Sequence, residues 1–262
     1  MDLGLKDKGV LVMASSGGIG RGVATEFARE GARVMLFARS EDKLAATAEA
    51  IGEETGNTPL LTVGDITDPG AVQGVVDHAA SEFGGLWALF NNTGGPAAGG
   101  FETFDDAAWL QAFELTTLGY VRAIRAALPH FREGGGGRVV NNTSVSTKQA
   151  IDGLLLSNVF RAGLVGLAKS LAREWGGEGI LVNTVGPGRI DTDRVAQLDT
   201  LWAGNKGISY EEQRAQAEAA IPLGRYGEPA DFGRTVVFLC SEANTYVTGQ
   251  NLLIDGGMVE GY

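Results

Sequence analysis

The chain is poor in the residues that form disulfides and metal sites. It holds one cysteine, Cys240, which excludes an internal disulfide and fits a reducing compartment such as the cytoplasm. Cys240 lies in an apolar run, so we expect it to be buried in a helix rather than to act as a nucleophile. Neither of the two histidines stands at metal-ligand spacing from cysteines or carboxylates, and no metal is expected.

Positive charge and long apolar runs are scarce as well. The sequence has 21 lysines and arginines against 32 aspartates and glutamates, which gives a formal net charge of -11 at pH 7. Charge of this sign repels phosphates, so nucleic acids and anionic membranes are not expected partners. No apolar run reaches the roughly 18 residues of a membrane span, and the first residues contain no apolar secretion signal. We therefore predict a soluble protein of the cytoplasm.

In place of these features the chain has a regular alternation of short apolar runs and helical patterns. The runs that predict buried strands are 9–14, 32–38, 60–63, 86–90, 137–142, 180–185 and 252–254. Helical patterns separate them, the longest at 107–131 and 158–175. This alternation is typical of an α/β fold, in which helices cover both faces of a parallel sheet. A length of 262 residues with no Pro-rich linker predicts a single domain over residues 1–262.

The segment 191–220 departs from that alternation. It is polar, and its composition predicts a loop first and a helix from Tyr210 onwards. A polar excursion of this length can cover a pocket as a substrate lid, or it can be an ordinary stretch of surface. Both interpretations are open from the sequence.

A glycine cluster follows the first predicted strand and opens the next helix. It reads Ala14-Ser15-Ser16-Gly17-Gly18-Ile19-Gly20. Glycines allow a phosphate to approach the backbone closely, and the N-terminus of a helix offers free N–H groups and the positive end of its dipole. In this strand-turn-helix setting the cluster predicts a dinucleotide site. The expected cofactor contacts are Ser15, Ser16, Gly18, Ile19 and Gly20.

The end of the second predicted strand bears on cofactor choice. A site for NAD(H) usually places an aspartate or glutamate about 20 residues after the glycines, where it binds the ribose hydroxyls. Here Ala38 leaves room, Arg39 can hold a 2′-phosphate in a forked geometry, and Ser40 can add a hydrogen bond. NADP(H) is therefore expected in preference to NAD(H). The alternative is that Arg39 is a solvated arginine at a strand end.

Together with further motifs, these residues resemble the short-chain dehydrogenase/reductase family over nearly the whole chain. Similar segments follow in the family's order: 64–68 beside the adenine ring, 90–94 at the end of the fourth strand, 186–192 around the nicotinamide, and 248–250 with 254–257 near the C-terminus. The resemblance implies a single-domain, doubly wound Rossmann-type fold and a homotetramer or homodimer that acts on a small-molecule substrate. It also implies cofactor contacts from Asp65, Ile66, Asn92, Thr93, Gly94, Pro187, Gly188, Ile190 and Thr192.

One glycine of the family's nucleotide motif is replaced. The family reads Thr-Gly-x-x-x-Gly-x-Gly, and Ala14 stands at the first glycine. An alanine is a modest change at that position unless the backbone there needs a positive φ.

The larger departure lies at the family's catalytic positions. The family helix reads Tyr-x-x-x-Lys-Ala-Gly, and here Ser157 and Arg161 take the places of the tyrosine and the lysine. Thr116 takes the place of the catalytic asparagine. Ser144, thirteen residues before Ser157, matches the family serine that holds the substrate carbonyl. Ser144, Ser157 and Arg161 are therefore the candidate catalytic residues.

These replacements change the chemistry that the site can perform. A serine hydroxyl is a weaker acid than a tyrosine phenol. An arginine keeps its charge at any working pH, so Arg161 can stabilise an oxyanion but cannot shuttle protons. A fixed cation beside Ser144 and Ser157 fits an anion or a carboxylate substrate. The alternative is that Arg161 binds the cofactor ribose or a carboxylate of the protein itself.

Three functions are compatible with these residues. The first is an NADP(H)-dependent oxidoreductase for a carbonyl or hydroxyl substrate, in which water held by Ser144, Ser157 and Arg161 supplies the proton. The second is a lyase or isomerase on the same fold, and the third is a catalytically inactive NADP(H)-binding regulatory protein. The retained cofactor motifs favour the first and the third, and fold analogy alone does not separate them.

Overall fold

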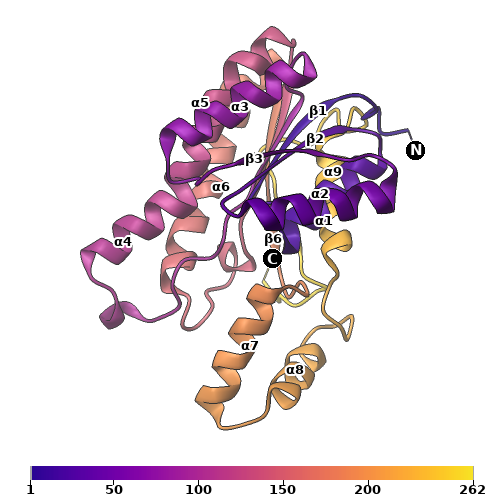
Figure 1. Ribbon diagram of the computed structural model, residues 1–262. Helices are drawn as coiled ribbons and strands as arrows, with labels where there is room; N and C mark the ends of the chain where they lie inside the picture. Colours follow the sequence, from indigo (N-terminus) through magenta and orange to yellow (C-terminus); the bar gives the residue numbers. More distant parts are fainter. Residues whose placement is uncertain (1, 262) are drawn as a thin grey trace.

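Seven parallel strands form one sheet with helices on both faces in the computed structural model, which describes residues 2–261 (Figure 1). The strands are β1 (Gly9–Met13), β2 (Arg33–Ala38), β3 (Leu60–Val63), β4 (Ala88–Asn91), β5 (Gly137–Asn142), β6 (Ile180–Pro187) and β7 (Asn251–Ile254). Their spatial order is β3-β2-β1-β4-β5-β6-β7, and every neighbouring pair is parallel. The predicted doubly wound α/β fold is confirmed.

The helices form one layer on each face of the sheet. They are α1 (Gly18–Arg29), α2 (Glu41–Thr55), α3 (Pro69–Phe83), α4 (Asp106–Phe113), α5 (Gly119–Glu133), α6 (Leu155–Trp175), α7 (Asp193–Lys206), α8 (Tyr210–Ala219) and α9 (Pro229–Cys240). Short 3-10 turns lie at η1 (Phe101–Thr103), η3 (Val145–Thr147) and η4 (Gly176–Glu178), and η2 (Glu114–Leu118) is a π-helix between α4 and α5. Figure 1 shows α1, α2 and α9 on one face and α3, α5 and α6 on the other. None of the helices in residues 2–261 is both long and apolar enough to cross a membrane.

Two separate cores explain why the strand sequences read as unbroken apolar runs. In β1, Val10 and Val12 face a core shared with α1, α2 and α9. Leu11 and Met13 face the other core, which is shared with α3, α5 and α6. A strand that is buried on both faces has no solvated side that would require polar residues. A charged residue anywhere in β1 would therefore enter one of the two apolar cores.

The strand order reverses beside β1, and this reversal determines where a ligand can bind. The chain winds outwards from β1 to β3, and it then returns to place β4 on the other side of β1. The connections after β1 and β4 run in opposite directions and leave a crevice between them, the usual ligand position in open α/β sheets. The loops after β5 and β6 reach the same edge, because all the strands are parallel.

Both halves of the segment 191–220 are helical, so the loop predicted for its first half is wrong. Thr192 is the N-cap residue of α7 and accepts a hydrogen bond from a backbone N–H of the first turn, and the helix ends at Gly207 with a φ of 68°. The buried residues of α7 are only Asp199 and Ala203. A helix with so narrow a buried face has little apolar periodicity, which is the pattern that predicts helices from sequence.

The helix predicted from Tyr210 is confirmed as α8, and α7 and α8 together project beyond the carboxyl ends of the strands (Figure 1). Asp199 anchors them from within: its carboxylate is 0% exposed, pairs with Arg189 and accepts a hydrogen bond from the hydroxyl of Tyr226 at 2.7 Å. Burial and this hydrogen bond raise the pKa of the Tyr226 phenol, which therefore stays a donor. The Arg214 guanidinium lies 4.7 Å from the centre of the same ring. The projecting helices are thus held to the domain by one buried carboxylate, two partly exposed arginines and the ring of Tyr226.

Candidate active site

A cavity of about 530 Å³ opens at the carboxyl ends of β1, β4, β5 and β6, where the strand order predicts a ligand. Side chains of α7 such as Leu198 and Trp202 form one of its walls. Thirteen of the predicted site residues line the cavity: Ser16, Gly18, Ile19, Asn92, Thr93, Gly94, Ser144, Ser157, Arg161, Pro187, Gly188, Ile190 and Thr192. Residues that are far apart in the sequence therefore meet in one continuous space.

Two predicted contacts from the glycine cluster shape the turn and do not line the cavity. The hydroxyl of Ser15 is fully buried and accepts a hydrogen bond from the N–H of Phe37 at 2.9 Å. A Cβ on Gly20 would lie 2.3 Å from the carbonyl oxygen of Ala14, so only glycine fits there. Ser15 thus ties β1 to β2, and Gly20 lets α1 begin directly against the turn.

Ala14 has a left-handed backbone, with a φ of 48°. A residue with a Cβ pays roughly 1–2 kcal/mol for this conformation, whereas glycine does not. The carbonyl oxygen of Ala14 accepts a hydrogen bond from the side-chain amide of Asn92 at 3.2 Å, which holds the turn against the end of β4. The family glycine that Ala14 replaces therefore stands at a position that does need a positive φ.

The predicted residues of the adenosine end lie beside the cavity rather than in its lining. The Arg39 side chain is 80% exposed and stands 3.8 Å from the Asp65 carboxylate. Hydrogen bonds from the backbone and side chain of Thr67, with a smaller contribution from Arg39, hold the pKa of Asp65 below its usual range. Ser40 stands at the N-cap position of α2 without a side-chain capping hydrogen bond, and Ile66 is buried in the core on the α3 side. The guanidinium of Arg39 is thus open to a further anionic partner.

Lys43 lines the cavity although the sequence interpretation passed over it. It lies in the first turn of α2, four residues after Arg39. That spacing places it about one helical turn from the strand end, which is the signal that could have identified it.

Two pairs of asparagine side chains join the ends of β4 and β5. Asn142 donates to the side-chain oxygen of Asn92 at 2.7 Å, and Asn91 donates to that of Asn141 at 2.8 Å. Among the described residues, the side-chain oxygens of Asn142 and Thr143 have no hydrogen-bond partner, although both residues are buried and line the cavity. They were missed from the sequence, although they directly precede Ser144. Buried polar atoms of this kind are available to a bound ligand.

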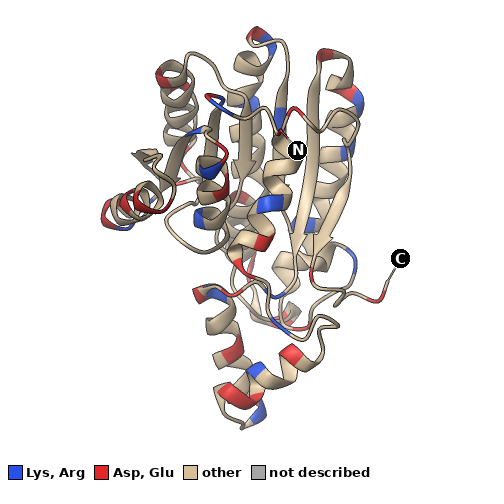
Figure 2. Cartoon of the chain, turned by 90° about the vertical axis from the view of Figure 1, so that its right-hand side faces the viewer, with Lys and Arg blue, Asp and Glu red and all other residues tan. Residues whose placement is uncertain are grey.

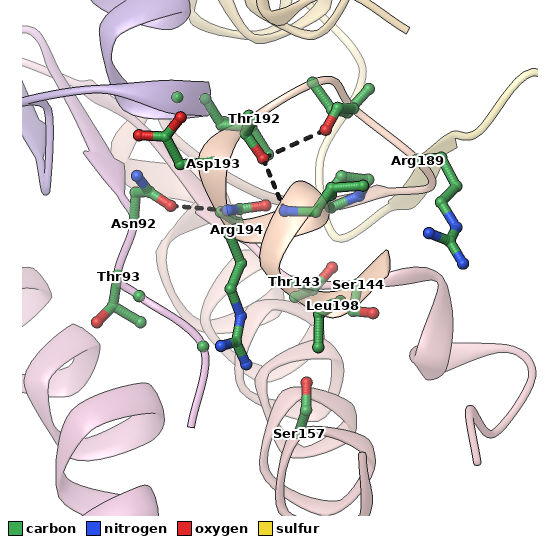
Figure 3. Close-up of a pocket in the computed structure, with 18 of the residues that line it drawn as sticks. Asn92, Thr93, Thr143, Ser144, Ser157, Arg189, Thr192, Asp193, Arg194 and Leu198 are labelled. Atoms are coloured by element: carbon green, nitrogen blue, oxygen red, sulfur yellow. Dashed lines mark hydrogen bonds between the residues drawn. The ribbon is translucent and has the colours of Figure 1, made fainter. Parts of the chain in front are cut away.

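Ser144 and Ser157 face the same cavity from different elements. Ser144 follows β5 and caps η3, where its oxygen accepts a hydrogen bond from the N–H of Ser146 at 3.1 Å. Its own O–H therefore remains free to donate. Ser157 lies in the first turn of α6, and Figure 3 shows its hydroxyl directed into the cavity on the side of Thr143 and Ser144.

Arg161 is one turn further along α6 and is buried, with 5% of its surface exposed. Its Nη1 donates to the carbonyl oxygen of Asn142 at 2.9 Å, and the hydroxyl of Tyr120 donates to the same oxygen at 3.1 Å. Within residues 2–261 no carboxylate forms an ion pair with Arg161, so the interpretation that it binds an internal carboxylate is wrong. Burial raises the pKa of the Tyr120 phenol, an effect that the nearby Arg161 charge opposes. Tyr120 is outside the described lining of the cavity.

Thr116, at the family's asparagine position, points away from the cavity. It lies in the π-helix η2, is fully buried, and donates to the carbonyl oxygen of Ala112 at 2.5 Å. A single π-helical turn inside an α-helix often marks a functional position. In this chain the backbone feature is present, but the side chain has no access to a ligand.

Arg194 is a further cavity residue that the sequence interpretation did not single out. It follows Thr192 by two residues on α7, and its Nη2 donates to the carbonyl oxygen of Pro96 at 3.0 Å. Burial, together with the charge of the nearby Arg161, lowers the pKa of Arg194 below the ordinary arginine value. Its position directly after the predicted nicotinamide loop is the signal that could have found it.

Known proteins that are similar to this chain cover almost all of its length. Residues 13–259 match the family model described as enoyl-(acyl carrier protein) reductase. The 3-oxoacyl-[acyl-carrier-protein] reductase FabG of Vibrio cholerae is 31% identical over 256 residues, which are 98% of this chain and 99% of that protein. FabG of Escherichia coli is 32% identical over 256 residues, which are again 98% of this chain and 99% of that protein. The crystal structure of L-sorbose reductase from Gluconobacter frateurii with NADPH and L-sorbose has a TM-score of 0.94, at 32% identity and with 100% of both chains covered.

Proposed function

The chain belongs to the short-chain dehydrogenase/reductase family of oxidoreductases, and we propose that it uses NADP(H) to interconvert a carbonyl and a hydroxyl group. The bound cofactor supplies or accepts the hydride. One observation carries the proposal: the glycine turn and the residues Ser144, Ser157 and Arg161 line a single cavity. Hydride transfer requires cofactor and substrate to be held side by side, which such a cavity allows.

The adenosine end of the cavity fits the phosphate of NADP(H). Arg39 is largely exposed and, within residues 2–261, its one ion pair is with Asp65 at 3.8 Å, so its forked guanidinium can turn to a 2′-phosphate. Lys43 adds a second cation from the first turn of α2. The similar L-sorbose reductase was solved with NADPH. NADP(H) is the proposed cofactor, with NAD(H) as the weaker alternative.

The reaction end is proposed to work with an unusual set of side chains. The free O–H of Ser144 donates to the carbonyl oxygen of the substrate, and Arg161 stabilises the negative charge that develops on that oxygen. Ser157 is too weak an acid to take the place of a tyrosine. A water molecule held by Ser144, Ser157 and Arg161 is therefore proposed to deliver the proton.

The proposal is tested in two steps on the purified protein. NADPH and NADH are first titrated by fluorescence, and then a single turnover is followed as loss of NADPH absorbance. The ketones are ethyl acetoacetate, L-sorbose and an acetoacetyl thioester. Tight NADPH binding with oxidation by at least one ketone supports the proposal, and the absence of NADPH binding overturns it.

A second candidate is an NADP(H)-binding protein without turnover. The observation in its favour is that no tyrosine or histidine is present in the described lining of the cavity. Tight NADPH binding with no oxidation by any of the three ketones would support this candidate over the first. A lyase or isomerase has no comparable support, because such a reaction does not call for the retained nucleotide turn.

The proposed assembly is a homodimer or homotetramer in the cytoplasm. Large apolar side chains are exposed on α4 at Leu110 and Phe113, on α6 at Val159, and on β7 at Leu252. Exposed apolar patches mark surfaces that other chains cover. Light scattering at micromolar concentration is expected to give a multiple of the 27.3 kDa chain mass, and a monomer would contradict the assembly. The location rests on the single cysteine and stays a prediction.

A further inference from the structure

The cavity is cationic although the protein is acidic. The chain carries a net charge of -11, and Figure 2 shows acidic residues spread along many of its elements, α7 and α8 included. The charged residues that line the cavity are Lys43, Arg161, Arg189 and Arg194, against the single acid Asp193. A positively charged cavity in a negatively charged protein concentrates anionic ligands inside it.

Two of these cations have no carboxylate to balance them. Arg189 is paired with the buried Asp199, and Lys43 belongs to the adenosine end. Neither Arg161 nor Arg194 takes part in an ion pair in the part of the chain that the structure describes. Figure 3 shows the Asp193 carboxylate and the Arg194 guanidinium pointing in opposite directions, although the residues are neighbours in sequence.

Arg194 presents most of its donors to the cavity. Its one hydrogen bond within residues 2–261 joins Nη2 to the Pro96 carbonyl, so Nε and Nη1 remain available. The neighbouring Gly95 makes room for it, because a Cβ there would lie 3.0 Å from Nη2. The fold thus holds a partly buried guanidinium beside a second one, an arrangement that costs free energy until an anion binds.

From this geometry we infer that Arg194 binds the carboxylate of an oxo-acid substrate, or of the hydroxy acid in the reverse direction. The inference rests on the proposed oxidoreductase function and names its substrate class. Ser144 then donates to the carbonyl oxygen and Arg161 stabilises the charge on it. The forked donors of Arg194 hold the carboxylate in a fixed orientation. The apolar body of the substrate lies against Ile151, Leu154, Leu198 and Met258, which also line the cavity.

The competing role for Arg194 is to bind the pyrophosphate of the cofactor. Figure 3 shows its side chain running from α7 towards Thr93 and Ser157, the side of the cavity where the candidate catalytic residues lie. A pyrophosphate is expected at the start of α1, where the free N–H groups of the helix lie. The direction of the side chain therefore favours the substrate.

The test uses two probes of nearly the same shape, the anion phenylacetate and its neutral amide phenylacetamide, with binding measured by calorimetry with and without NADPH. We expect the wild type to bind phenylacetate about tenfold or more tighter, as a charge-assisted forked contact predicts. Arg194→Gln should abolish this preference and change the NADPH Kd by less than about threefold. Arg194→Lys should retain part of it. Arg125→Gln, which removes one exposed positive charge on α5, is the matched control and should keep the full preference.

Equal binding of the two probes by the wild type would overturn the inference. So would an Arg194→Gln protein that loses NADPH affinity and keeps its preference for phenylacetate, because Arg194 would then serve the cofactor. Reduction of phenylpyruvate and of its methyl ester adds a turnover measurement, in which Arg194→Gln should raise KM for the acid alone. If the wild type binds NADPH and reduces ethyl acetoacetate but shows no preference for the acid, only this inference is wrong. Failure to bind NADPH defeats the proposed function itself.

Discussion

The cavity has a nucleotide end, around the glycine turn after β1, and a reaction end, around Ser144, Ser157 and Arg161. The two ends depend on different parts of the chain. The nucleotide end is made mainly by backbone: the start of α1 and a turn at Ala14, which the side-chain amide of Asn92 holds in place. The reaction end is made by functional groups on side chains, Ser157 and Arg161 above all. Backbone geometry tolerates few substitutions, whereas side-chain groups can be exchanged on an unchanged helix. This difference is compatible with our proposal that Ser157 and Arg161 form an unusual reaction end on a scaffold that keeps the nucleotide turn.

The scaffold under the reaction end is correspondingly intact. The π-helix η2 is present and Thr116 is outside the described lining of the cavity, while α6 carries Ser157 and Arg161 on one face, as residues four apart on a helix do. The carbonyl of Asn142 is bound by both Arg161 and Tyr120. The two ends can therefore be separated experimentally, because a change in one need not disturb the other.

The largest expected effect is on turnover at the reaction end. Arg161→Ala should lower the rate of single-turnover NADPH oxidation by about 10²-fold, comparable to losing an oxyanion donor. Ser157→Ala should cost much less, because its hydroxyl is a poor acid. The Asn142 carbonyl keeps its bond to Tyr120 in the first variant, so folding should survive. Wild-type rates for Arg161→Ala would show that the residue is structural.

A comparable change at the nucleotide end should alter affinity and leave the chemical step alone. Arg39→Ala should weaken the binding of NADPH by about 1.5–3 kcal/mol, the cost of one charge-assisted contact, and leave the binding of NADH almost unchanged. Fluorescence titration of both cofactors measures this directly, with Arg125→Gln as the control for charge. Equal affinity of the wild-type protein for NADPH and NADH would remove the reason for assigning Arg39 to the phosphate.

The contrast between the ends can also be removed by restoring the family pattern. The double variant Ser157→Tyr with Arg161→Lys regains a phenol beside a lysine, and general acid catalysis is worth about 10²–10⁴-fold in favourable cases. Because the surrounding pocket is shaped for a serine, we expect a smaller gain of about tenfold on ethyl acetoacetate. A bulkier oxo acid such as phenylpyruvate should react more slowly than in the wild type. No gain on ethyl acetoacetate would show that Ser157 and Arg161 are not what limits turnover of small ketones.

The smallest effect is expected from repairing the one irregular residue of the nucleotide end. Ala14→Gly relieves the left-handed alanine but gains entropy in the unfolded chain, so the net stabilisation should be about 0.5–1 kcal/mol. Ala24→Gly in the middle of α1 should instead destabilise by about 1 kcal/mol. Urea denaturation of the two variants gives the comparison. A lower midpoint for Ala14→Gly would indicate that its methyl group makes a contact worth more than the strain.

The sequence by itself determined the fold and the location of the site. Apolar runs with helical patterns between them specify a parallel sheet, because strands buried on both faces leave no other pattern. The glycine cluster, Ser144 and the pair Ser157 and Arg161 hold fixed positions relative to strand and helix ends. Their meeting in one cavity follows from the parallel topology, which brings the carboxyl ends of all the strands to one edge.

Only the tertiary structure decided what individual side chains do there. The hydroxyl of Ser15 accepts a hydrogen bond from β2, Ala14 takes a positive φ, and the side chains of Asp193 and Arg194, which both line the cavity, point in opposite directions. The charge balance of the cavity was equally hidden, since Arg189 is neutralised by an aspartate on α7, a segment predicted as a loop. Patterns along the chain report which surface of an element is apolar. The partner of a polar group depends on distances through space, which sequence periodicity does not encode.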